Sequence, residues 1–244
     1  METLILALFM LVGANASVAP VVEVEEDVYS YDAWREYKRE LTGREWDYDF
    51  RRLFYTWTED ITGGEFHEWV EIASRDQTAG WIMPLDLWVD ARGDVHLLWT
   101  ERAIDTRLRE RFFPGERQSH ALNYAVLRQG AVALRRTLAI AEEGVSEEIP
   151  QFGRFQVTPE ERLFVCFFVR GRDAAGARVA ENRVLEIRDG GEVGEAVRLP
   201  LEHPMSSFFT ATTRGGSPPS HTLEMLGTRA DGARTISYAR VRLW

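Results

Sequence analysis

The chain has 244 residues, of which 45% are hydrophobic, 11% aromatic and 28% charged. A chain this apolar can build a large core, so the composition excludes an intrinsically disordered protein. The 29 basic and 39 acidic residues give a formal net charge of −10. This charge argues against electrostatic binding to nucleic acid or to an anionic membrane, and we expect neither as a partner.

The first sixteen residues support two interpretations. Residues 4–12 are apolar and are followed by Ala14-Asn15-Ala16, a pattern typical of a signal-peptide cleavage site, although Glu2 stands where a basic residue is usual. The alternative is that residues 1–16 contain a first core strand. A cleaved signal would make the protein secreted or periplasmic; otherwise we expect it in the cytoplasm.

Helical periodicity is scarce in the rest of the chain. Residues 33–41 fit a short helix, and Ile104, Leu108 and Phe112 recur four apart in a charged segment. Most other segments alternate apolar and polar residues with period two and end in glycine-containing turns. This alternation predicts antiparallel hairpins.

The predicted hairpins recur as a unit of four short strands. The first full unit has strands at 85–89, 95–100, 121–127 and 132–140, and the second at 155–157, 163–169, 183–187 and 196–201. A third copy covers 208–212, 222–227 and 236–243, and an earlier partial copy covers 53–58 and 66–73. Four antiparallel strands repeated about every 60 residues are typical of propeller blades, whereas a β-sandwich is the alternative.

We therefore predict an all-β fold, with one β-propeller domain over residues 17–244. About four blades are expected, and their portions lie at roughly 50–80, 81–144, 147–205 and 206–244. An open arc of blades would leave strand edges and apolar faces uncovered. The chain would then be part of a larger propeller, associate with another copy, or hold a divergent blade before residue 50.

Two segments carry a family resemblance. Residues 90–96 (DARGDVH) with Asn123-Tyr124-Ala125 resemble the D-x-x-G-x-x-H and Y-A pattern of sialidase-like propellers that carry bacterial neuraminidase repeats. Residues 59–66 are similar to a degenerate Asp-box turn, although the full S-x-D-x-G-x-T-W box does not occur in the sequence. The resemblance implies a carbohydrate ligand and, in an active member, a glycosidase.

Candidate ligand-binding residues follow from the propeller prediction, because propellers bind ligands where the loops between strands two and three meet the loops between blades. Arg102, Arg170 and Arg229 hold matching positions after the second strand of three successive units. Three arginines would bind a sugar carboxylate, as the resemblance implies, and guanidinium geometry suits that group. Trp81, as a stacking residue, and Arg154 complete the candidate substrate-binding set. The alternative is that these arginines only cap strand ends.

Catalysis on a glycan would need a proton donor and a base or nucleophile. The candidate catalytic residues are Asp86, Glu101 and His120. His120 would act as a base, as in propeller polysaccharide lyases. A lyase is less favoured here than a sialidase-like hydrolase. Tyr124 and Tyr238 share a repeat position and are expected to pack, which leaves a hydrolase without an evident nucleophile.

We expect no cofactor and no metal. The five histidines lack ligand spacing, His96 lies between apolar neighbours, and the single cysteine, Cys166, sits in an apolar run that predicts a buried thiol. Two functions remain open: a sialidase-like hydrolase acting on acidic sugars, and a non-catalytic propeller that binds a glycan or a protein.

Overall fold

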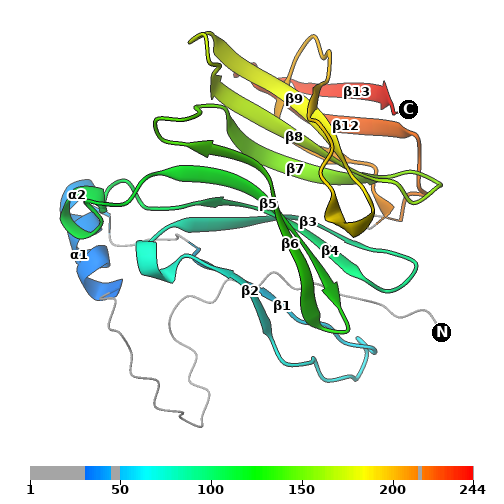
Figure 1. The fold of residues 1–244 in the computed structure, drawn as a ribbon, viewed down its shortest axis with the longest axis horizontal. Helices are drawn as coiled ribbons and strands as arrows, with labels where there is room; N and C mark the ends of the chain where they lie inside the picture. Colours follow the sequence, from blue (N-terminus) through cyan, green and yellow to red (C-terminus); the bar gives the residue numbers. More distant parts are fainter. Residues whose placement is uncertain (1–30, 45–49, 214–215, 244) are drawn as a thin grey trace. The chain divides into compact units, whose positions relative to one another are not determined.

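The computed structural model describes residues 31–44, 50–213 and 216–243 (Figure 1). The N-terminal segment, on which the signal-peptide and first-strand interpretations depend, lies outside these residues. The described part is mostly β, with thirteen strands, two short 3-10 helices and two α-helices, α1 (Tyr31–Thr42) and α2 (Arg109–Phe112). No helix within it is long and apolar enough to cross a membrane.

The strands form four antiparallel sheets that follow the predicted repeat. One four-stranded sheet has the order β3 (Trp81–Val89), β4 (Val95–Arg102), β5 (Ser119–Arg128), β6 (Ala131–Glu142). The next has the order β10 (Val197–Arg198), β9 (Arg178–Ile187), β8 (Leu163–Arg172), β7 (Ile149–Val157). These eight strands confirm the two full units.

The two other sheets are smaller than a four-stranded blade. The C-terminal sheet has three strands, β11 (Met205–Thr210), β12 (Thr222–Arg229) and β13 (Ile236–Arg242), and the N-terminal sheet pairs β1 (Arg52–Tyr55) with β2 (Val70–Ser74). The predicted hairpins are thus confirmed, but the first and last units are incomplete within the described ranges. Their arrangement around a shared axis stays a prediction.

The chain divides into two compact units. The first contains residues 1–83 and 101–119, and the second contains residues 84–100 and 120–244. The division passes through the β3–β6 sheet, so most of that sheet belongs to the second unit.

In the first unit, α1 packs through one apolar side. Trp34 of α1 forms a buried cluster with Ala79 and Leu108, and its ring meets Phe113 edge to face at 5.4 Å. One turn after Trp34, Lys38 is also buried, and its Nζ lies 3.4 Å from a carboxylate oxygen of Asp105. The chain's single lysine is therefore a core residue, although a charged side chain is usually exposed.

Asp105 is held as an anion by more than one cation. The Arg107 guanidinium donates to both of its carboxylate oxygens, and the Arg107 backbone N–H donates to Oδ1. Burial favours the neutral acid, but these hydrogen bonds and Lys38 hold the pKa of Asp105 well below its usual range. In this contact between α1 and the segment after β4, two cations share one buried carboxylate.

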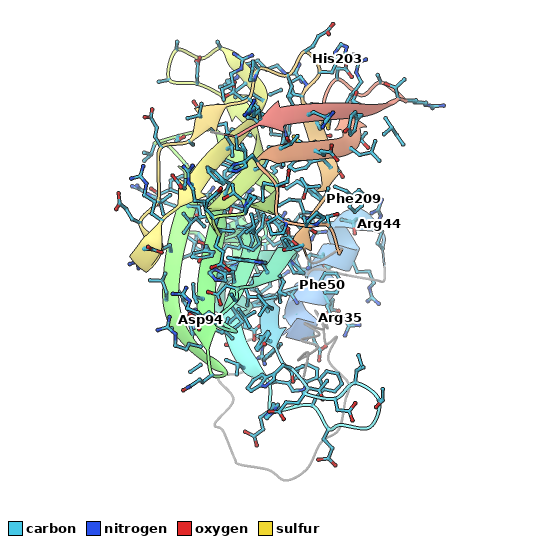
Figure 2. All side chains as sticks on the ribbon, turned by 90° about the vertical axis from the view of Figure 1, so that its right-hand side faces the viewer. Arg35, Arg44, Phe50, Asp94, His203 and Phe209 are labelled. Atoms are coloured by element: carbon cyan, nitrogen blue, oxygen red, sulfur yellow. The ribbon has the colours of Figure 1, made fainter. Side chains whose placement is uncertain are left out.

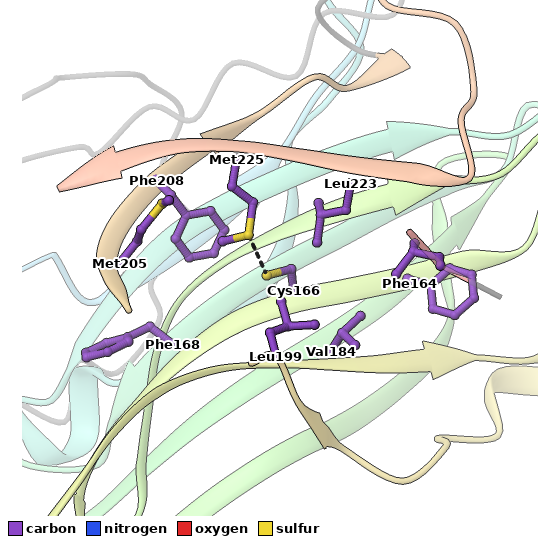
Figure 3. Packing of buried hydrophobic residues seen from close by; sticks show 10 residues of the cluster. Phe164, Cys166, Phe168, Val184, Leu199, Met205, Phe208, Leu223 and Met225 are labelled. Carbon is purple, nitrogen blue, oxygen red and sulfur yellow. Dashed lines mark hydrogen bonds between the residues drawn. The ribbon is translucent and has the colours of Figure 1, made fainter. Parts of the chain in front are cut away.

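In the second unit, the main core lies between the sheet of β7–β10 and the sheet of β11–β13. Phe164, Cys166 and Phe168 alternate along β8 and meet Phe208, Leu223 and Met225 (Figure 3). The Cys166 sulfur lies 3.9 Å from the Met225 sulfur, and burial raises the pKa of the thiol far above its usual value. The prediction of a buried, unreactive cysteine is confirmed.

A polar side chain joins the same two sheets. Asn182 of β9 accepts a hydrogen bond from the Met205 backbone N–H at 2.8 Å and donates to the Met205 carbonyl at 3.0 Å. Both ends of its amide are thus used by the first residue of β11. These two hydrogen bonds fix the position of the first residue of β11 relative to β9. A purely apolar contact would specify this position less strictly.

The Lys38–Asp105 contact gives a stability prediction. We expect Asp105→Asn to lower the free energy of unfolding by about 3–5 kcal/mol, because the buried Lys38 ammonium loses its carboxylate. Lys38→Met should cost clearly less, because Arg107 still neutralises Asp105. Urea unfolding followed by circular dichroism measures both, and equal losses for the two variants would contradict this account of the cluster.

Candidate functional site

The D-x-x-G-x-x-H segment forms the tight turn between β3 and β4. Asp90 Oδ1 accepts the backbone N–H groups of Arg92 and Asp94, each at 2.9 Å, and Gly93 adopts φ 82°, a conformation that favours glycine. A carboxylate oxygen of Asp94 lies 2.6 Å from a guanidinium nitrogen of Arg128. Arg128 is the residue that leads into the next turn. The motif is explained by the geometry of the turn.

His96 lies directly below this turn and is buried, as predicted. Its Nδ1 is 2.6 Å from the Tyr124 hydroxyl, its ring is 4.5 Å from that of Trp88, and its Nε2 is 3.6 Å from Asp90. Burial lowers the pKa of His96, and the Asp90 charge opposes that effect only in part. Burial also raises the pKa of Tyr124 far above 10. Both side chains belong to the core.

Asp86 and Arg154 join the first strands of the two four-stranded sheets. The Asp86 carboxylate is fully buried and accepts the backbone N–H groups of Leu87 and Phe155, each at 2.9 Å. Arg154 of β7, also buried, donates through one guanidinium nitrogen to the carbonyls of Leu85 and Gly153. These two predicted site residues are brought together, and the contacts described are with backbone.

Arg154 also lies against two aromatic rings. Its guanidinium carbon is 4.3 Å from the centroid of Phe152 and 5.8 Å from that of Phe209. The Phe209 side chain is 66% exposed, so one face of this group reaches solvent (Figure 2). Phe209 is a residue that sequence reasoning missed, because two successive phenylalanines in a strand give no sign of which one faces outward.

Three predicted site residues lie in the first unit. Glu101 forms an ion pair with Arg75 at 2.5 Å, and Arg102 and Trp81 are half-buried at strand ends. Glu101 and Arg102 therefore belong to a different unit from Arg170 and Arg229. The structure does not join all three arginines of the predicted clamp within one unit.

Arg170 and Arg229 lie at the same end of the two sheets that share the main core. Arg170 pairs with Ile149 at the start of β7, and Arg229 pairs with Met205 at the start of β11. Asn182, which binds Met205, pairs with Phe168, two residues before Arg170. The ends of β8 and β12 are thus tied together through β9 and β11.

The local backbone explains why Arg170 projects from the sheet. Gly171 has φ 139°, and a Cβ placed there would lie 1.8 Å from the Glu147 carbonyl oxygen. Only glycine at position 171 allows the backbone at Glu147 to approach β8 this closely. Arg170, which immediately precedes Gly171, is exposed. Arg170 is thus presented by a constrained strand end.

The two arginines differ in their partners. Arg229 donates to Asp231, and this hydrogen bond lowers the pKa of Asp231. Among the described residues, Arg170 has no carboxylate partner, and the residue is exposed. His120 is the second residue of β5, belongs to the second unit and is half-buried.

Comparison with known proteins gives little further information. No family model matches the chain, and no curated protein sequence matches it. One solved structure with distant similarity is an endo-arabinase from Bacteroides thetaiotaomicron VPI-5482, with 11% sequence identity, a TM-score of 0.36, and coverage of 81% of this chain and 73% of that chain. The resemblance to sialidase-like propellers stays a prediction.

The buried position of His96 predicts a loss of stability in acid. Because its pKa is lowered in the folded protein, the folded state favours neutral histidine, and its contribution is complete above the unfolded pKa of about 6.5. As the pH falls below that value, the unfolded chain binds the proton first. The free energy of unfolding should then fall by at most about 1.4 kcal/mol per pH unit from this group.

The measurement is urea unfolding at a series of pH values between 7.5 and 5. His96→Gln should flatten this part of the profile, whereas the matched surface variant His203→Gln should keep it. An unchanged slope in His96→Gln would show that another group causes the acid sensitivity.

Proposed function

We propose that this protein is a carbohydrate-recognition module that binds an acidic sugar at the end of the sheets where Arg170 and Arg229 lie. The observation that carries the proposal is the position of Arg170: it is exposed, has no carboxylate partner among the described residues, and is fixed near the end of β8 by the Gly171 backbone. A guanidinium held in place suits a carboxylate, because its parallel N–H groups match the two oxygens.

Arg229 supports this site as a second cation. Its side chain is 22% exposed and already binds Asp231, so a ligand carboxylate would have to share or displace that partner. Such competition is compatible with moderate affinity, which is usual where a ligand is held by few charged contacts. Arg170 should therefore contribute more to binding than Arg229.

The same geometry favours binding over catalysis. Asp86, the best buried acid of the predicted catalytic set, bonds two backbone N–H groups, and Glu101 is engaged with Arg75 in the other unit. A glycosidase needs two carboxyl groups that flank one bond of the substrate. The finer hypothesis of a sialidase-like hydrolase would need Glu101 and His120 to serve the same bound sugar.

The proposal predicts saturable binding of acidic oligosaccharides. Isothermal titration with sialyl and uronic-acid oligosaccharides should show binding that Arg170→Ala weakens by about tenfold or more, because a charged hydrogen-bond pair is lost. Arg188→Ala is the matched control, since Arg188 is an exposed arginine that follows the opposite end of the same sheet. Neutral analogues of the same sugars should bind more weakly.

Two outcomes would contradict the proposal. Equal effects of Arg170→Ala and Arg188→Ala would show nonspecific charge attraction, and no binding of any acidic oligosaccharide would remove the function itself. Release of reducing sugar or unsaturated product by the unmodified protein would instead support the enzyme hypothesis.

A further inference from the structure

The C-terminal sheet has one face in the core and one face in solvent. Phe208, Leu223 and Met225 point into the main core and are fully buried. On the opposite face, Phe209 pairs across the strands with Leu226, and Leu226 pairs with Tyr238. Their exposed fractions are 66%, 50% and 58%, so a row of three large side chains crosses the sheet in solvent.

This row is part of a larger apolar face. Ile236, two residues before Tyr238 on β13, is 75% exposed and lies on the same side. The prediction that Tyr238 packs like Tyr124 is therefore wrong for the described chain. Contiguous exposed apolar residues of this kind are typical of interaction surfaces, whereas single ones are ordinary. We call Phe209, Leu226, Ile236 and Tyr238 the C-terminal face.

The β1–β2 sheet has the same asymmetry. Leu53, Tyr55 and Ile72 are buried on one side. On the other side, Phe54 meets Trp69 edge to face at 5.8 Å, and Trp69 is 44% exposed. Phe54, Trp69 and the adjacent exposed Glu71 form what we call the N-terminal face.

The two segments that carry these faces have opposite net charge. Residues 52–74 contain five acidic residues and one arginine, a formal charge of −4, whereas residues 222–242 contain four arginines and two acidic residues, a formal charge of +2. Arg240 and Arg242 are exposed on β13 beside Tyr238, and Arg240 forms an ion pair with Glu224 of β12 at 3.1 Å. Glu71 is exposed beside Phe54. Each face thus has an apolar centre, and the segments that carry the two faces have net charges of opposite sign.

We propose that the N-terminal face of one copy of this chain packs against the C-terminal face of a second copy. Sheet-on-sheet packing already covers the β8 side chains with β11 and β12 inside one chain, so the contact has a precedent in this molecule. A heterologous contact of this type closes into a ring or extends into a chain of copies. Complementary charge favours this pairing over contact between two identical basic faces.

Sedimentation velocity over a concentration series tests the association. The full chain should show a mass above that of a monomer, and Leu226→Lys should weaken association by about tenfold or more, because a charge would enter an apolar contact. Ile140→Lys is the matched control, since Ile140 is a 45% exposed aliphatic residue on β6, outside both faces. Circular dichroism should show that both variants fold, because both positions are exposed.

A cross-linking experiment tests which faces meet. Glu71→Cys and Arg240→Cys are prepared as separate proteins, mixed, and treated with a short bis-maleimide; the native Cys166 is fully buried and should not react. Cross-linked dimers should form in the mixture and not in either variant alone. A monomeric mass at all concentrations, or dimers from Arg240→Cys alone, would overturn the proposal, and neither result would affect the sugar site at Arg170.

Discussion

An exchange of side-chain hydrogen bonds between β3 and β7 sets the geometry of the second unit. Asp86 reaches from β3 to the Phe155 N–H, and Arg154 reaches from β7 to the Leu85 carbonyl. Both charged groups are buried, so each would destabilise the fold if its partner strand moved by one residue. Register between the two sheets is therefore specified by polar contacts as well as by packing. The position of β7, and with it the end of β8 that presents Arg170, depends on this exchange.

The strands could be predicted from the sequence because their periodicity is local. The alternation of apolar residues and the glycine turns located both four-stranded units, and the amphipathic segment at 33–41 corresponds to α1. The pattern could not show which groups form the ion pairs and hydrogen bonds of a buried charged residue. Lys38 pairs with an aspartate 67 positions away in the chain, and Asp86 with a backbone N–H 69 positions away. Such long-range partners leave no periodic signal.

The same limit applies to the candidate site. An acid in an apolar strand, such as Asp86, and a histidine beside a conspicuous turn, such as His96, are reasonable functional candidates from residue type alone. In the structure, one carboxylate supports two backbone N–H groups, and the imidazole fills the core beneath the Asp90 turn. Arg170 differs because the features that present it, a strand end and a following glycine, are visible in the sequence as Val169-Arg170-Gly171. Its exposure follows from local geometry, whereas its role in ligand binding stays a prediction.

Phe208 and Phe209 show how function and stability divide along one strand. They are chemically identical neighbours, yet one is fully buried against β8 and the other is 66% exposed. Strand alternation dictates that adjacent side chains face opposite sides, so a second apolar residue in a strand with one covered face must meet solvent or a partner. Phe209, Leu226 and Tyr238 stay between 50% and 66% exposed, although the Arg154 guanidinium lies 5.8 Å from the Phe209 ring centroid. A face of this composition is better explained by an additional sheet that covers it than by the requirements of the single chain.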